Sequence, residues 1–164
     1  MPTVEQSIDA NVAAATAYDQ WTRFESFPQW MEGVASVDRI DGSRLHWVAK
    51  VRAEFATVEN ETREWDAQIT EQSRDKRVSW ESIGGQPGAK PNAGAVTLEP
   101  LGDSSCRVTF RMDWEPEGAL ETTSEVLGAV NQVLAADLAR FKDFIEARGD
   151  RADPGQGERL LKTG

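Results

Sequence analysis

Cysteine and histidine are almost absent from this sequence, which contains one residue of each, Cys106 and His46, among 164 positions. A single cysteine cannot form an internal disulfide bond. The chain also offers none of the paired cysteine and histidine spacings that hold zinc or iron in proteins. We therefore expect no dedicated metal site and no bound cofactor.

Long apolar runs and an excess of basic residues are missing as well. No N-terminal apolar segment resembles a signal peptide or a membrane-spanning helix. Aspartate and glutamate number 28 against 18 lysine and arginine residues, which gives a net charge of -10. This balance argues against nucleic acid or an anionic membrane surface as the main partner. The sequence therefore predicts a cytoplasmic protein with no nucleic-acid partner and no integral membrane association.

The strongest pattern that is present lies near the C-terminus. Apolar residues recur there at steps of three and four, which places them on one face of a helix: Val126, Val130, Leu134, Leu138, Phe141 and Ile145. Three further apolar residues widen this stripe, namely Leu127, Val133 and Phe144. The opposite face is polar and includes Asp137, and Thr122 with Glu125 has the spacing of a capping box. We predict an amphipathic helix over 122–148, about 40 Å long, that lies across a broad apolar surface.

Ahead of this helix, most of the chain alternates between apolar and polar residues, as strands do. The expected strands are 3–9, 34–40, 45–51, 65–71, 77–83, 93–101 and 106–114. Asn11 can cap a helix that runs to about residue 20, and Phe24–Met31 suits a short helix broken near its proline. Asp41-Gly42 is a strong hairpin signal. The pattern predicts an α+β fold in which the long helix lies across one antiparallel sheet.

No linker or internal repeat divides the chain. The residues after Gly149, 150–164, are polar and glycine-rich, and we expect them to form a disordered tail. The sequence therefore predicts a single domain over residues 1–149.

Three motifs give the chain a family resemblance. They are Tyr18-x-x-Trp21-x-x-Phe24-x-x-Phe27-Pro28-x-Trp30-Met31, Trp65-Asp66-Ala67-x-Ile69-Thr70-Glu71 and Phe141-Lys142-x-Phe144-Ile145-Glu146-x-Arg148-Gly149. Over residues 2 to about 149, these motifs and the order of elements resemble the START-like (SRPBCC) superfamily, and within it the bacterial polyketide cyclase/dehydrase-type branch. The chain departs from this branch at Ala53–Glu61, which is more acidic than the resemblance leads us to expect.

The resemblance implies a helix-grip fold. In that fold a curved antiparallel sheet, here of about seven strands, wraps around the long C-terminal helix, and two short helices follow the first strand. The resemblance also implies a pocket between the sheet and the helix for a small apolar or aromatic ligand.

The ligand-binding residues that we expect lie on predicted inward faces or beside the mouth of this pocket. They are Tyr18, Phe27, Trp30, Met31, Trp65, Trp80, Ser82, Asn92, Phe110, Val126, Val130 and Leu134. Each tryptophan can equally be an ordinary core residue. The polar members, together with Glu71, either orient a ligand and move protons or only satisfy backbone groups at strand ends.

No catalytic residue can be assigned from the sequence. His46 titrates near neutral pH without help, but alternation places it on the outer face of its strand, opposite Trp47. Cys106 lies among apolar residues, where a buried inert thiol is expected. A serine-histidine triad would need His46 on the inner face.

Two classes of function therefore stay open. The chain either carries or senses a small hydrophobic molecule such as a lipid, an isoprenoid or a polyketide, or it is a polyketide aromatase/cyclase or dehydratase that uses polar groups in the same cavity. Both readings are compatible with a homodimer.

Overall fold

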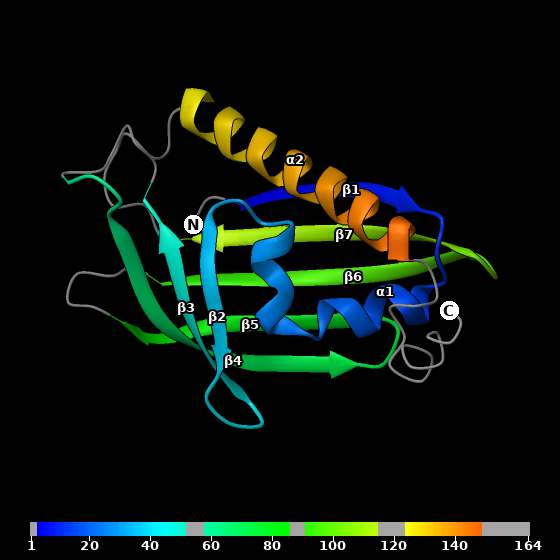
Figure 1. The fold of residues 1–164 in the computed structure, drawn as a ribbon, viewed down its shortest axis with the longest axis horizontal. Helices are drawn as coiled ribbons and strands as arrows, with labels where there is room; N and C mark the ends of the chain where they lie inside the picture. The colour runs from blue at the N-terminus through cyan, green and yellow to red at the C-terminus, as the bar shows by residue number, and fades with distance from the viewer. Residues whose placement is uncertain (1–2, 52–57, 86–90, 115–123, 149–164) are drawn as a thin grey trace.

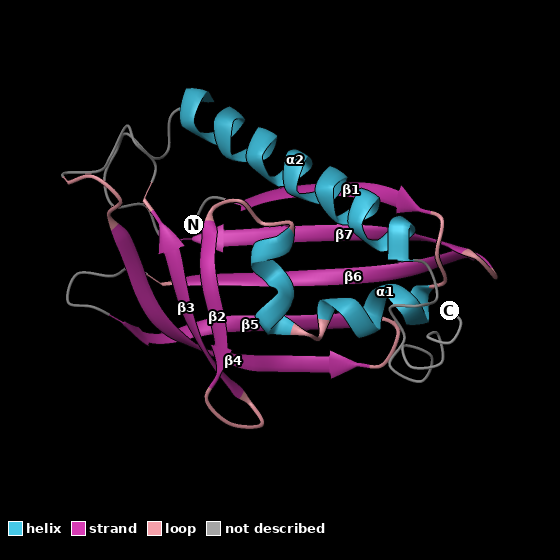
Figure 2. Cartoon of the chain, in the orientation of Figure 1, coloured by secondary structure: helices cyan, strands magenta, loops and turns pink. Residues whose placement is uncertain are grey.

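The computed structural model describes residues 3–51, 58–85, 91–114 and 124–148. Figures 1 and 2 show the elements that these residues form. In chain order they are β1 (Thr3–Ala10), α1 (Ala14–Trp21), the 3-10 helix η1 (Phe24–Gln29), β2 (Val34–Arg39), β3 (Arg44–Lys50), β4 (Thr62–Ser73), β5 (Arg77–Gly85), β6 (Asn92–Gly102), β7 (Ser105–Trp114) and α2 (Ser124–Arg148). This order of elements is the predicted one. Thr122 of the predicted capping box, most of the acidic stretch and the predicted tail lie outside the described residues.

The described strands form one antiparallel sheet in the order β1-β7-β6-β5-β4-β3-β2. Its register shifts at four places, within the pairs β2–β3, β4–β5 (twice) and β6–β7. Such bulges bend a strand and increase its twist, and Figure 1 shows β2 and β3 running across the direction of β6 and β7, with β4 bending from one direction to the other. The result is the curved sheet and long C-terminal helix of the predicted helix-grip fold.

One of these bulges moves Glu71 from the predicted inner face of β4 to the outer face. Ile69 pairs with Trp80, but the next pair along the ladder is Glu71 with Ser79, because β4 carries an extra residue there. The Glu71 side chain therefore lies on the outer face, where it accepts a hydrogen bond from Arg77 Nε at 3.0 Å. The prediction that Glu71 reaches the cavity is wrong.

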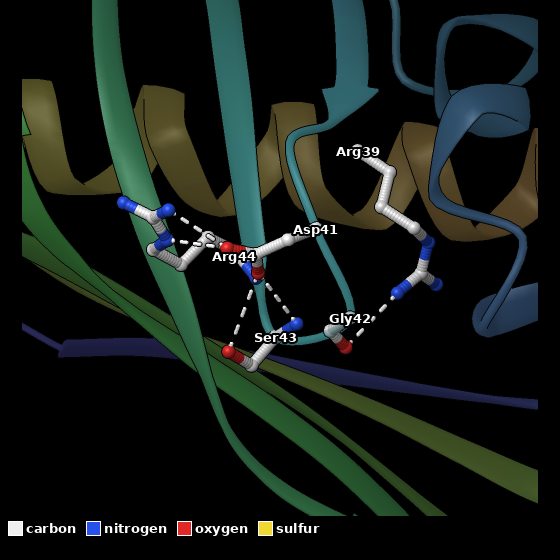
Figure 3. A network of polar contacts seen from close by, with 5 residues as sticks. All are labelled: Arg39, Asp41, Gly42, Ser43 and Arg44. Carbon is white, nitrogen blue, oxygen red and sulfur yellow. Dashed lines mark hydrogen bonds and ion pairs between the residues drawn. The ribbon is translucent and has the colours of Figure 1, made fainter.

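The hairpin between β2 and β3 turns at Asp41 and Gly42, as predicted. Asp41 Oδ1 accepts hydrogen bonds from the backbone N–H groups of Ser43 and Arg44, at 2.9 and 3.0 Å (Figure 3). Asp41 Oδ2 accepts a third from Arg44 Nε at 2.8 Å. The Ser43 hydrogen bond is the largest of several contacts that lower the pKa of Asp41. The carboxylate thus holds the turn that sets β2 against β3.

Helix α1 begins later than predicted. Its N-cap is Ala13, which offers no side-chain cap, so the prediction that Asn11 caps this helix is wrong. The backbone N–H of Asn11 instead donates to Glu146 Oε2 at 2.7 Å. This contact ties the segment before α1 to the end of α2.

The two halves of α2 differ in burial. Val133, in the N-terminal half, is 39% exposed, and Val130 is only half-buried. The apolar residues further along are almost fully buried: Leu134, Leu138, Phe141 and Ile145. The interior is therefore closed beneath one half of the helix and less completely filled beneath the other.

An aromatic cluster from α1 and η1 fills the closed half of the interior. Trp21 lies 4.9 Å from Phe141 between ring centroids, and Trp30 lies 5.1 Å from Phe141. Phe24 and Phe27 join the same cluster, and all five rings are fully buried. Pro28 lies within η1, and the three residues per turn of a 3-10 helix bring Phe24, Phe27 and Trp30 together at the spacing of three that the sequence predicted.

Neither α1 nor α2, within the part of the chain that the structure describes, is long and apolar enough to cross a bilayer. The domain limit at residue 149, the cytoplasmic location, the lack of a nucleic-acid partner and the homodimer stay predictions.

Candidate ligand-binding cavity

A cavity of about 410 Å³ lies between the N-terminal half of α2 and the sheet. This volume falls in the range of ~300–1,000 Å³ that small-molecule sites occupy. The segment after η1, strands β2 to β7 and α2 supply its lining: Met31, Glu32, Gly33, Val34, Trp47, Ala49, Lys50, Val51, Trp65, Trp80, Asn92, Phe110, Met112, Val130, Val133 and Asp137. Most of these side chains are apolar, so the cavity suits an apolar molecule.

Three tryptophans on neighbouring strands line one side of the cavity. Trp47 stacks on Trp65 with 6.0 Å between ring centroids and an angle of 6° between ring planes. Trp47 also stacks on Trp80, at 5.5 Å and 29°. Gly94 of β6 makes room for the Trp80 indole, because a Cβ at that position would lie 2.7 Å from Trp80 Cζ2. Trp47 of β3 thus joins the other two rings into one row, although β4 lies between β3 and β5 in the sheet.

The structure brings half of the twelve predicted ligand-binding residues to this cavity. These six are Met31, Trp65, Trp80, Asn92, Phe110 and Val130. Four others lie in the packed core and do not line it: Tyr18, Phe27, Trp30 and Leu134. Ser82 Oγ accepts a hydrogen bond from the backbone N–H of Asn92 at 2.9 Å, so it satisfies a strand-end group. The side chain of Val126 lies outside the described residues.

Several lining residues were missing from the prediction although their faces were known. Alternation placed Trp47 and Ala49 on one face of their strand, and it placed Met112 on the same face as Phe110. Periodicity gives the face of a strand but not the position along the helix that the face meets. Only the tertiary arrangement shows that these side chains share a cavity.

Asp137 is a polar residue on the cavity wall, although it was predicted to lie on the polar face of α2. It is 6% exposed, so its assignment to the polar face of α2 is wrong. Its position is three residues after Leu134 and four before Phe141, which is the spacing of the buried stripe. That spacing was the available signal, and the charge of the side chain obscured it.

The Asp137 carboxylate is held on one side. Its Oδ1 accepts hydrogen bonds from Arg140 Nη2 and from the backbone N–H of Glu32, the latter at 3.4 Å. Arg140 is itself fixed, because its Nε donates to the Trp30 carbonyl at 3.1 Å. Burial raises the pKa of Asp137, and the Arg140 hydrogen bond opposes that shift. The cavity therefore contains a carboxyl group whose ionised form is poorly solvated.

The two residues considered for catalysis lie elsewhere. His46 is on the outer face, as predicted, with Nδ1 2.7 Å from Asp66 Oδ1 and Nε2 3.0 Å from Glu64 Oε1. The hydrogen bond to Asp66 is the main cause that raises the pKa of His46. Cys106 is buried, and burial raises the pKa of its thiol to about 11. Neither side chain lines the cavity.

Metal-ligating residues do not gather anywhere in the described ranges: no three histidine, cysteine, aspartate or glutamate residues are grouped so as to hold an ion. The polar side chains on the cavity lining are those of Glu32, Lys50, Asn92 and Asp137.

The sequence of the chain is similar to a known family and to a protein from Streptomyces lincolnensis. The family described as "Polyketide cyclase / dehydrase and lipid transport" matches residues 10–143. An uncharacterized 17.2 kDa protein of Streptomyces lincolnensis is 40% identical over 157 residues, which span 96% of this chain and 98% of that protein.

Two solved structures share the fold at low sequence identity. A START superfamily protein from Mycobacterium smegmatis has a TM-score of 0.65 and 16% identity, over 88% of this chain and 97% of that one. The di-domain ARO/CYC BexL from the BE-7585A biosynthetic pathway has a TM-score of 0.67 and 19% identity, over 89% of this chain and 47% of that one. These likenesses concern the fold, and they confirm the predicted helix-grip architecture. The curved sheet, the C-terminal helix and the match over residues 10–143 together show that the chain belongs to the polyketide cyclase/dehydrase and lipid transport family.

Proposed function

We propose that this protein binds a small apolar or aromatic molecule in the cavity between α2 and the sheet, and that it carries or senses this molecule. The observation that carries the proposal is the cavity of about 410 Å³ with its row of three tryptophans and its otherwise mostly apolar lining. Membership of a family described by both cyclase/dehydrase and lipid transport activity supports an apolar ligand.

The size of the cavity sets the affinity that is attainable. Removing apolar surface from water contributes ~25 cal/mol per Å², so a ligand that buries about 300 Å² gains roughly 7 kcal/mol before the cost of association. Micromolar binding corresponds to about 8 kcal/mol. A well-fitting ligand is therefore needed, and a poorly shaped one will bind weakly.

Filling the cavity from the helix side tests the proposal. Val130 is half-buried on the lining, so Val130→Trp should place an indole in the open space. We expect this variant to bind the apolar dye Nile red at least tenfold more weakly than the wild type, with a change of less than about 1 kcal/mol in the free energy of unfolding. Fluorescence titration and urea denaturation measure the two quantities.

Gln132→Trp is the matched control, because Gln132 is exposed on the same helix and does not line the cavity. It should leave dye binding unchanged. Overpacking of a filled core would instead cost about 1–3 kcal/mol. If the wild type binds neither Nile red nor a fatty acid and Val130→Trp is strongly destabilised, the interior is solid and the proposal fails.

Asp137 supports a second candidate, an enzyme of the aromatase/cyclase or dehydratase type. A carboxyl group with a raised pKa on a cavity wall has the properties of a general acid or base. A carrier returns its ligand chemically unchanged. An enzyme would alter the mass or absorbance of a bound polyketone, and Asp137→Asn would abolish that change while apolar dye binding persists.

A further inference from the structure

The Asp137 carboxylate, on the cavity lining, accepts its hydrogen bonds from described residues on one oxygen only. Both hydrogen bonds that it accepts from described residues, those from Arg140 Nη2 and the Glu32 backbone N–H, end on Oδ1. Oδ2 has no partner among the described residues, and Asp137 itself lines the cavity. Oδ2 is therefore the atom of this carboxyl that can accept a hydrogen bond from a molecule in the cavity.

Asp137 Oδ2 is not among the described polar atoms that are both fully buried and without a partner, so it still has surface that is accessible to water. Burial is the main cause of the raised pKa of Asp137, and the hydrogen bonds from Arg140 and from the Glu32 backbone oppose that shift. A ligand that fills the cavity without offering a donor would take that water away and give no partner in return, which costs free energy. A ligand of the same shape that supplies a donor to Oδ2 avoids this cost, so the two are discriminated.

The charge around Asp137 indicates what kind of donor fits. The Arg140 guanidinium already pairs with the carboxylate, and Lys50 adds a second cation to the cavity lining. Glu32 also reaches Arg140, at 3.8 Å, but its side chain is 80% exposed. An ammonium group would thus enter an apolar space in which the carboxylate of Asp137 is already paired with Arg140. A neutral hydroxyl group needs no counter-ion.

We propose that the ligand is an apolar or aromatic molecule that carries a neutral hydroxyl group, and that this hydroxyl donates its hydrogen bond to Asp137 Oδ2. The proposal rests on the proposed function, since it names the ligand class of the same cavity. Asp137 is then the residue that recognises the hydroxyl group of an otherwise apolar ligand.

A matched pair of probes tests this recognition in the wild-type protein. 2-Naphthol and 2-methoxynaphthalene have the same ring system, but only the first can donate a hydrogen bond. We expect 2-naphthol to bind roughly 10- to 100-fold more tightly at about pH 8, which is the range for one hydrogen bond to a charged group. Isothermal titration calorimetry gives both dissociation constants, and naphthalene serves as the purely apolar reference.

Asp137→Asn then assigns the preference to the carboxylate. The amide oxygen can replace Oδ1 as acceptor for Arg140, which turns the amide N–H group toward the cavity. The preference for 2-naphthol over its methyl ether should fall to within about twofold, or reverse, while naphthalene affinity stays unchanged. Asp143→Asn, at an exposed position of α2 away from the cavity, should keep the wild-type preference.

The outcomes separate this inference from the proposed function. Equal wild-type affinities for 2-naphthol and 2-methoxynaphthalene would overturn the hydroxyl recognition and leave an apolar-ligand site standing. Tighter binding of 1-naphthalenemethylamine than of 2-naphthol would overturn the neutral-donor class. Absence of binding by all probes, naphthalene included, would overturn both proposals. The comparison of probes on the wild type tests hydroxyl recognition even if Asp137→Asn does not fold. Urea denaturation of the variant shows whether it folds.

Discussion

Gly94 is a residue whose missing side chain shapes the cavity. The Trp80 indole lies against it so closely that a Cβ would be 2.7–2.9 Å from three atoms of the ring. Gly94→Ala should therefore displace Trp80 and destabilise the protein by about 1–3 kcal/mol, as overpacking does. Urea denaturation measures this change, and tryptophan fluorescence reports the displaced indole.

Gly128→Ala is the control for that substitution. Gly128 lies in α2 with nothing within 4 Å of a built Cβ, and alanine is favoured over glycine in a helix by about 1 kcal/mol. This variant should be slightly more stable than the wild type. If both alanine variants shifted stability in the same direction, the close approach of Trp80 to Gly94 would not be what distinguishes the two sites.

His46 makes stability depend on pH. Its pKa is raised above the usual 6.5 because the imidazolium form is hydrogen-bonded to Asp66 and Glu64 in the folded chain. A raised folded pKa gives a stabilisation that is fully present below the unfolded pKa and lost as pH rises through the folded pKa. The free energies of unfolding of the wild type and His46→Gln should therefore differ most below about pH 6.5 and converge at higher pH.

Urea denaturation of both proteins between about pH 5 and pH 9 follows this convergence. Ligand affinity should be the same for the two, since His46 lies on the outer face of the sheet and not on the cavity lining. A stability difference that is constant with pH would mean that the two carboxylates do not bind the imidazolium. A loss of ligand affinity would mean that β3 faces the other way.

At the scale of elements, α2 is anchored at one end and borders the cavity at the other. Leu138 is 1% exposed beside the aromatic cluster, whereas Val133 is 39% exposed at the cavity. Leu138→Ala should cost about 2–5 kcal/mol, the range for a buried leucine. Val133→Ala should change stability by less than about 1 kcal/mol and act mainly on ligand affinity. Urea denaturation and Nile red titration of the two variants distinguish these effects, and equal losses of stability would contradict the burial gradient.

The elements themselves were predictable, and their irregularities were not. Alternation located every described strand, and the steps of three and four located α2, because backbone periodicity and side-chain burial are directly linked. The bulge after Ile69 could not be seen, since it inserts a residue without a sequence signal and turns Glu71 outward. Asn11 was a reasonable cap by residue type, but its backbone is engaged by Glu146 on α2, a contact far away in the sequence.

At the scale of the whole molecule, the sequence predicted which face of each element points inward. It did not predict how deeply each apolar residue on that face is buried. Trp30 and Val130 both belong to apolar patterns, yet Trp30 is sealed in the core and Val130 borders the cavity. The difference arises where α1 and η1 fill the space beneath α2, which depends on three elements at once. Asp137 was misplaced for a related reason, since a partner on its own helix and a backbone N–H beyond η1 allow a carboxylate to be buried there.

The strand order also governs how the molecule is made. Every neighbouring pair in the sheet consists of consecutive strands except β1 and β7, whose paired residues Thr3 and Asp113 are 110 positions apart. At ~5–20 residues per second, a ribosome completes β7 on the order of ten seconds after β1 has been synthesised. Until then β1 has no strand to join, and the meander from β2 to β7 can form hairpin by hairpin without it. The first strand to be synthesised is thus the last to be paired, and a nascent chain that stalls before residue 105 holds an unpaired strand with its hydrogen-bonding edges open.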